Sequence, residues 1–244
     1  ALQVDHPRIW IWGVRTMIIL GLDISMTATG WAIAELKGEK LNLLRCGVIA
    51  TKKSKEKVAT TLDSIRRARS IYVELGKVLS SELGLRIDLI CVEAMSWPRN
   101  ASSSIKMAIA WGAIAPLLAD RPLIPIGPMA LKMAVSGKKT ASKEEVASGV
   151  RSLMPLATSR VLREFVQKAS LQEHCWDALG AILASMKTEK FQLLKAGLSE
   201  KKPADFRYSR FEISQRFAEG FDPDRAANQF ASDLVAAAKP APSP

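Results

Sequence analysis

A continuous apolar run opens the part of the chain that can be interpreted. MIILGLDIS at residues 17–25 ends in polar side chains and predicts a buried central strand. Thr29–Gly30 then predicts a turn into WAIAELK at 31–37. A second turn at Gly38–Glu39 leads into LNLLRCGVIA at 41–50. We therefore expect a meander of three antiparallel strands.

Between about Ser54 and Leu83 the hydrophobic period becomes that of a helix. The apolar positions of this segment are Val58, Leu62, Ile65, Tyr72, Leu75, Leu79 and Leu83. The basic residues at its start and on its outer face are Lys52, Lys53, Lys55, Arg66, Arg67 and Arg69. We expect one long amphipathic helix.

The second half of the chain alternates strands with helices. IDLICVEA at 87–94 and LIPIG at 123–127 predict two more buried strands, and a small-residue helix at about 101–119 separates them. Further helices follow to about residue 187. This order predicts an α/β fold in which a mixed five-stranded sheet has helices on both faces. The carboxyl ends of its strands should gather side chains at one edge.

Three regions follow from this pattern. Residues 1–16 precede the first convincing strand, so they are an N-terminal extension or a remnant of cloning. Residues 17–187 form the expected folded domain. Residues 188–244 form a basic C-terminal extension with two weaker helical patterns, and Asp222–Pro223 marks the start of one of them. Its last five or six residues, about 239–244, should be disordered.

Composition narrows the function classes. With 244 residues, 48% of them hydrophobic, the chain can bury a substantial core. A formal net charge of +11 favours a polyanionic partner such as nucleic acid, although a ribosome-like or simply basic protein has the same balance. No segment reaches the apolar length that spans a bilayer, so we expect no membrane partner.

The cysteines point to a reducing setting. Cys46, Cys91 and Cys175 are odd in number and show no CxxC spacing, so neither a disulfide framework nor a zinc knuckle is indicated. We expect the cytoplasm or another reduced compartment that contains DNA, whether viral, nucleoid or organellar.

Three carboxylates stand at apolar positions where an unpaired charge is costly. Asp23 ends the first strand, Glu93 lies near the end of the strand after the long helix, and Asp177 lies on an apolar helix. His174 and Glu173, three and four residues before Asp177, could share its helix face. Carboxylate oxygens are the ligands that Mg²⁺ and Mn²⁺ prefer, and two such ions can drive phosphodiester hydrolysis.

Each of these residues also has an ordinary explanation. Asp23 could cap a turn, Glu93 could simply end a strand, Asp177 could cap a helix or form a salt bridge, and His174 could lie in a packing interface. Their conjunction favours one acidic metal site inside a basic protein. Cutting a polyanion with divalent metal ions requires that combination.

Four stretches carry a resemblance to a known family. GLDISMTATGWAI resembles the first strand and turn of RuvC-type Holliday-junction resolvases, which belong to the RNase H-like nuclease superfamily. VEAMSWPRNASSSIKMAIAWGAI resembles their second acidic strand, junction-facing loop and following helix. LKMAVSGKKTASKEEV resembles their basic loop, and HCWDALGAIL their closing acidic helix. The resemblance covers about residues 17–187 in order.

The resemblance implies roles for particular residues. Asp23, Glu93 and Asp177 would bind the metal, and His174 would be a fourth ligand or a general acid/base, with two Mg²⁺ ions per site or Mn²⁺ in their place. The basic residues implied at the DNA or the scissile phosphate are Lys132 and Lys143, with Lys138 and Lys139 extending the patch. The implied junction-facing residues are Trp97, Arg99 and Asn100. A solvated lysine face is the alternative for the basic loop.

Two departures from the family pattern are visible. Ser96 holds the offset at which the family usually presents an aromatic wedge, and Trp97 follows it, either to stack on an unpaired base or to anchor the core. The compact bacterial resolvases have no counterpart of residues 188–244, and such an extension resembles viral or organellar members. We expect the extension to add DNA contact, dimer packing or stability, without chemistry.

The residues therefore predict a metal-dependent, structure-selective endodeoxyribonuclease that resolves Holliday junctions or other branched DNA. Cutting two symmetric strands implies a homodimer, with the helix at 101–119 as its interface. A non-catalytic branched-DNA-binding protein on the same fold is the alternative. An actin- or hexokinase-like phosphotransferase is disfavoured because its second domain is missing. The exonucleases of this fold carry Asp-x-Glu in the first strand, whereas Ser25 stands here.

Overall fold

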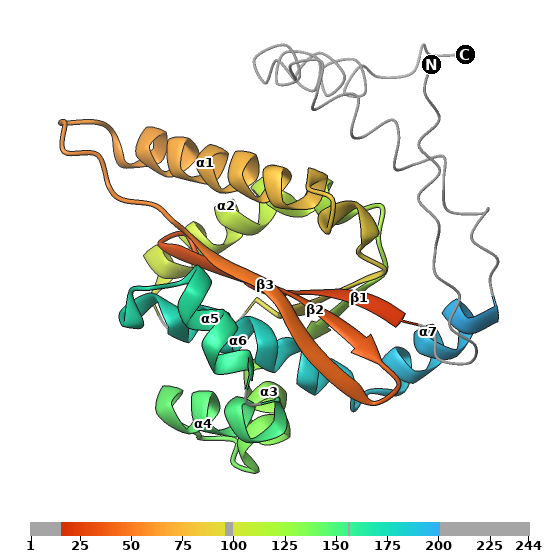
Figure 1. Cartoon of the computed structure of the whole chain (residues 1–244). Coiled ribbons are helices and arrows are strands. Elements are labelled where there is room, and N and C mark those ends of the chain that lie inside the picture. The colour runs from red at the N-terminus through yellow and green to blue at the C-terminus, as the bar shows by residue number, and fades with distance from the viewer. Residues whose placement is uncertain (1–15, 96–99, 156, 201–244) are drawn as a thin grey trace, which may run out of the picture. The chain divides into compact units, whose positions relative to one another are not determined.

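The computed structural model describes residues 16–95, 100–155 and 157–200 of the chain. The leading segment, most of the C-terminal extension, Trp97 and Arg99 lie outside these described residues. Within the described residues the chain forms a layered α/β unit (Figure 1).

A five-stranded sheet forms the centre of this unit. Its strands are β1 (Thr16–Asp23), β2 (Ala28–Lys37), β3 (Lys40–Ala50), β4 (Leu89–Glu93) and β5 (Leu123–Ile126). Their order in the sheet is β3-β2-β1-β4-β5. The β1–β2 and β2–β3 pairs are antiparallel, and the β1–β4 and β4–β5 pairs are parallel. The predicted mixed five-stranded sheet is confirmed.

Helices cover both faces of the sheet (Figure 1). On one face lie α1 (Thr60–Ser80) and α2 (Ala101–Leu118), with a short 3₁₀ turn at Gly84–Arg86. On the other lie α3 (Pro128–Ser136), α4 (Lys143–Leu153), α5 (Ala157–Phe165) and α6 (Ala169–Ser185). A final helix, α7 (Glu189–Glu200), follows. Of these, α6 makes the most extensive contact with the sheet because it crosses β1, β2 and β4.

The first turn differs from its prediction. Thr29 and Gly30 lie inside β2, and Gly30 pairs with Asp23, so the chain reverses at residues 24–27 instead. The Ser25 side chain closes this turn by accepting hydrogen bonds from the backbone N–H groups of Thr27 and Ala28. Thr29 is buried and donates its hydroxyl to the Ser25 carbonyl at 2.8 Å. The polar residue and the glycine are typical of a turn, but the pairing of β2 with β1 keeps both of them in the strand.

The long helix and the domain boundary also shift. α1 begins at Thr60 because residues 51–59 form an irregular connection after β3. Arg67, expected on the outer face of this helix, is buried. At the other end, Phe191 of α7 is fully buried in the core, with Leu194 packed beside it. The packed unit thus continues past Lys187, where the sequence places its end.

The two faces of the sheet bury alternate residues, as the strand period of two requires. In β1, Met17 and Ile19 join the core beneath α6, so Gly21 and Asp23 belong to the same face. In β4, Leu89 and Cys91 join that core, which assigns Glu93 to this face as well. The strand pattern therefore directs both carboxylates toward α6.

Two glycines bring α6 into backbone contact with the sheet. A Cβ at Gly21 would lie 2.1 Å from the carbonyl oxygen of Ala178, and one at Gly30 would lie 2.1 Å from that of His174. No side chain fits at either place, so only glycine permits this approach. The contact fixes how far α6 stands from β1 and β2.

The helix α2 is more apolar than the sequence analysis expected. Its 18 residues have a mean hydropathy of 1.3, so by length and composition they suffice to cross a membrane, and the expectation that no segment reaches that length is wrong. The core helix of a globular protein meets the same criterion. Here only Ala110, Ile114, Leu117 and Leu118 are buried, so much of an apolar helix faces outward.

The glycine contact predicts a specific stability pattern. Gly30→Ala should lower the free energy of unfolding by about 1–3 kcal/mol, because the new methyl group displaces α6. Gly197→Ala on α7 is the matched control: nothing lies within 4 Å of the added methyl group, and it should raise stability by about 0.5–1 kcal/mol. Urea unfolding followed by circular dichroism measures both. Equal effects of the two substitutions would contradict the packing account.

Candidate active site

Asp23 and Glu93 meet at one edge of the sheet. Leu22 pairs with Val92 in parallel register, so the next residues, Asp23 and Glu93, stand level at the carboxyl ends of β1 and β4. Both belong to the face covered by α6, and both are half-buried. The strand pairing alone therefore places the two carboxylates side by side, as the sequence analysis expected.

The helix α6 supplies the other two candidate residues. Because the backbone of His174 rests on Gly30, and Gly30 pairs with Asp23, the imidazole lies directly over the end of β1. Nδ1 of His174 lies 3.0 Å from Oδ2 of Asp23, and each side chain is exposed by less than a fifth. Asp177 follows one turn later and is also half-buried.

Glu173 extends this polar cluster toward the solvent. Its Oε1 lies 3.6 Å from Nε2 of His174 and 3.0 Å from Nζ of Lys143. His174 therefore stands between two carboxylates, Asp23 and Glu173. The family resemblance gives a role to His174 and none to Glu173, and only the position of α4, which carries Lys143, reveals the contact.

The carboxylates repel one another electrostatically. Burial raises the pKa of Glu93 to about 7, and the negative charges of Asp23 and Asp177 add to the shift, whereas Lys132 and Lys143 oppose it. Burial likewise raises the pKa of Asp177 to about 6, with Asp23 as the next cause. The hydrogen bond to Asp23 raises the pKa of His174 despite its burial. Burial and the neighbouring carboxylates thus both disfavour the charged forms of Glu93 and Asp177.

This donor set fits a hard divalent cation. Carboxylate oxygens suit Mg²⁺ and Mn²⁺, and a bound ion would offset the burial and the mutual repulsion that raise the pKa values of Glu93 and Asp177. Among the described residues, no three His, Cys, Asp or Glu side chains are already gathered tightly enough to form a finished metal centre.

Lysines border the acidic edge. Lys132 on α3 is half-buried, and Lys138 and Lys139 are exposed in the connection between α3 and α4. Lys143 is the first residue of α4, whose start is fixed by a capping box between Ser142 and Glu145. The Nζ atom of Lys138 lies 2.6 Å from Oε1 of Glu145, and Lys143 pairs with Glu173. Two of the four lysines thus already have acidic partners.

Comparisons with known proteins agree with this architecture. The sequence profile of the family described as crossover junction endodeoxyribonuclease RuvC matches residues 19–163, which is more than half of the chain. RuvC of Natranaerobius thermophilus is 30% identical over 142 residues, covering 57% of this chain and 82% of that protein. RuvC of Methylobacterium radiotolerans is 29% identical over 145 residues, covering 59% of this chain but only 65% of that protein.

A solved structure gives the same result. Thermus thermophilus RuvC in complex with a Holliday junction substrate has 27% sequence identity and a TM-score of 0.54. The match covers 74% of this chain and 96% of that one.

The chain belongs to the RuvC family. The profile match includes Asp23 and Glu93 but ends before α6. The place of His174 and Asp177 in this RuvC member therefore rests on the geometry of α6, whose contact with Gly21 and Gly30 brings them to the edge of the sheet.

The loop expected to face a junction is described only in part. Trp97 and Arg99 lie outside the described residues of this RuvC member, so their roles stay predictions. Asn100 is the N-cap of α2, and its side-chain oxygen accepts a hydrogen bond from the backbone N–H of Ser102 at 2.9 Å. This capping role is enough to account for an asparagine at position 100, and contact of Asn100 with DNA stays a prediction.

The raised pKa of Glu93 predicts a pH-dependent stability. A carboxyl group whose folded-state pKa exceeds its ordinary value of 4.5 stabilises the fold fully below pH 4.5, and this contribution is lost as pH rises through about 7. Wild-type protein in EDTA should therefore lose about 1–3 kcal/mol from this group between pH 5 and pH 8.

Urea unfolding at a series of pH values measures this loss. Glu93→Gln removes the titrating group and should flatten the profile, whereas Glu82→Gln, on an exposed residue, should leave the profile unchanged. A profile of Glu93→Gln that parallels wild type would contradict the electrostatic account.

Proposed function

We propose that this RuvC family member resolves Holliday junctions and other branched DNA by metal-dependent hydrolysis of phosphodiester bonds. The observation that carries the proposal is the convergence of Asp23, Glu93 and Asp177 at one edge of the sheet, with His174 beside Asp23. The Thermus thermophilus relative was solved with a Holliday junction, which supports branched DNA as the substrate.

Asp23, Glu93, Asp177 and His174 would hold the metal, proposed as two Mg²⁺ ions, with Mn²⁺ able to replace them. Bound divalent ions lower the pKa of water and stabilise charge on the oxygens of a phosphodiester under attack. The protein's part is to hold desolvated carboxylates ready, so that their charge is fully available when the site is loaded.

His174 has two possible tasks at this site. The hydrogen bond to Asp23 favours a proton on Nδ1 and leaves Nε2 facing Glu173 and the solvent side. From there Nε2 can bind a cation or pass a proton to a leaving oxygen. Lys132 and Lys143 balance the negative charge of Glu93, and they also suit the scissile phosphate.

We further propose that the protein acts as a homodimer with α2 at the interface. The side chain of Ile105 on α2 is 59% exposed, and Gly112 has open space around it. An apolar helix that leaves so much of its surface uncovered needs a partner, and small residues let two such helices approach closely. A twofold dimer would present two sites to the two symmetric strands of a junction.

The remaining proposals concern setting and extension. All three cysteines are buried and free, which suits a reducing compartment that contains DNA. The extension beyond Lys187 is proposed to add DNA contact or dimer packing without chemistry. Its first helix packs on the core through Phe191, and residues 201–244 lie outside the described residues.

Removing a proposed ligand should separate cutting from binding. Asp23→Asn, Glu93→Gln and Asp177→Asn should each reduce cleavage of a synthetic four-way junction in Mg²⁺ by at least about 10³-fold, because metal charge is lost while the basic surface remains. His174→Ala should be milder and should depend on whether Mg²⁺ or Mn²⁺ is supplied.

Asp120→Asn is the control, since Asp120 is exposed before β5, at the opposite edge of the sheet. Gel shifts and denaturing gels on the same samples report binding and cutting. Near wild-type cutting by any of the three carboxylate variants would refute the site. Binding without cutting by the wild type would favour the non-catalytic alternative.

The dimer proposal has its own test. Ile105→Glu should convert the dimer to monomers, because it places a charge in the proposed apolar contact. Leu153→Glu on α4 is the matched control, since that leucine is also half-exposed, at 50%, on a helix at the other face of the sheet, and it should leave the dimer intact. Sedimentation equilibrium measures both. A monomeric wild type, or a dimeric Ile105→Glu, contradicts the assigned interface.

A further inference from the structure

A second basic segment lies at the same edge of the sheet as the acidic site. β3 ends at Ala50, which pairs with Ala28, and β3 runs in the same direction as β1. The chain then leaves the edge as the long connection at 51–59, drawn at the left of the unit between β3 and α1 (Figure 1). Neither the metal site nor the α3–α4 lysines include any of its residues.

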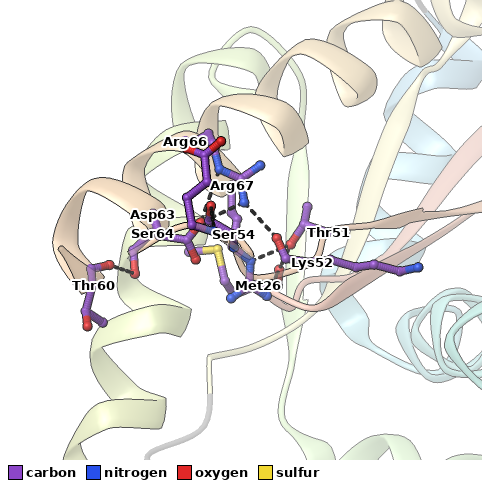
Figure 2. Close-up of polar contacts among 10 residues, drawn as sticks. Met26, Thr51, Lys52, Ser54, Thr60, Asp63, Ser64, Arg66 and Arg67 are labelled. Carbon is purple, nitrogen blue, oxygen red and sulfur yellow. Dashed lines mark hydrogen bonds and ion pairs between the residues drawn. The ribbon is translucent and has the colours of Figure 1, made fainter. Parts of the chain in front are cut away.

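This connection is bonded to the turn that follows Asp23. The backbone N–H of Thr51 donates to the carbonyl of Thr27 at 2.9 Å, and the Thr51 hydroxyl donates to the carbonyl of Met26 at 2.5 Å. Arg67 completes the contact from α1: its Nε donates to Thr51 Oγ1 at 2.8 Å and its Nη2 to the Met26 carbonyl at 3.0 Å (Figure 2). A buried guanidinium thus ties three segments together beside the catalytic edge.

A second set of bonds orients the chain beyond Thr51. Nη2 of Arg66 donates to the carbonyl of Lys52 at 2.7 Å, and Arg66 also pairs with Asp63 (Figure 2). Oδ1 of Asp63 also accepts a hydrogen bond from the backbone N–H of Ser54 at 3.1 Å. The backbone of residues 51–54 is therefore held by Asp63, Arg66 and Arg67 of α1, so Lys52 and Lys53 project from a fixed backbone.

The connection presents four exposed lysines, which we name the connection lysines. They are Lys52, Lys53, Lys55 and Lys57. Glu56 is the single acid among them, and across the described residues no ion pair engages any of the four. In contrast, Lys138 and Lys143 of the α3–α4 region are paired with Glu145 and Glu173. The connection lysines are thus the less neutralised of the two basic groups at this edge.

We propose that the connection lysines form a second DNA-binding surface, which binds the phosphates of a DNA arm leading away from the strand at the metal site. The inference rests on the proposed function. DNA is the partner favoured here because the lysines share an edge with a site for phosphodiesters, and unpaired lysines on a fixed backbone bind phosphates without first breaking internal ion pairs. Branched DNA needs such separate contacts, since its arms diverge from the crossover.

The test compares two double variants of equal charge. Lys53→Ala with Lys55→Ala removes two connection lysines, and Lys37→Ala with Lys40→Ala removes two exposed lysines from the β2–β3 turn at the opposite edge. Fluorescence anisotropy in EDTA measures affinity for a long-armed four-way junction across a range of salt concentrations. The connection variant should bind more weakly, and its slope of log affinity against log salt should fall by up to about 1.8, or 0.9 per lost contact. The control should keep the wild-type slope.

Cleavage in Mg²⁺ by the same proteins separates this inference from the proposed function. The connection variant should need more enzyme than the wild type for half-maximal cutting, because it binds the arms more weakly, although its lysines touch none of the candidate catalytic residues. An unchanged salt slope in that variant overturns the inference. If the same variant loses affinity for polyglutamate, the connection lysines bind an acidic protein and the inference is overturned as well. A wild type that binds with the expected slope but never cuts overturns the proposed function alone.

Discussion

The close contact of α6 with β1 and β2 is the constraint on which the candidate site depends. Gly21 and Gly30 admit the backbone of Ala178 and His174 to distances that no side chain would allow. The contact places one turn of α6 over the ends of β1 and β4, where Asp23 and Glu93 already stand in register. Without it, the sheet would present two carboxylates and the helix two more residues, with nothing to bring them together.

The interior of the candidate site is acidic, whereas the surface around it is basic. Glu93 and Asp177 are desolvated, and their pKa values rise because burial and neighbouring carboxylates disfavour a second and third negative charge. The exterior is basic, with lysines on the α3–α4 side and on the connection before α1. Such a surface attracts polyanions and its centre attracts cations, so one charge pattern would serve both of the proposed partners.

Much of this architecture could be predicted from the sequence because its signals are local. Apolar runs ending in Asp23 and Glu93 identify buried strands, and the helical period around Asp177 identifies α6. The misplaced features depend on tertiary contacts. Gly30 looks like a turn residue but is needed for helix packing, and Arg67 looks like a surface residue but is buried by its bonds to Thr51 and Met26. The pairing of Lys143 with Glu173 joins two helices that no local pattern relates.

The metal site proposed here depends on the glycine-mediated contact, which would bring Asp23, Glu93, Asp177 and His174 around a divalent cation. Anomalous X-ray diffraction from crystals grown with Mn²⁺ tests it most directly, because the signal locates the metal without reference to activity. We expect anomalous density between the carboxylates at the ends of β1 and β4 and the facing turn of α6. Mn²⁺ bound elsewhere, with none at this edge at saturating concentration, would contradict it.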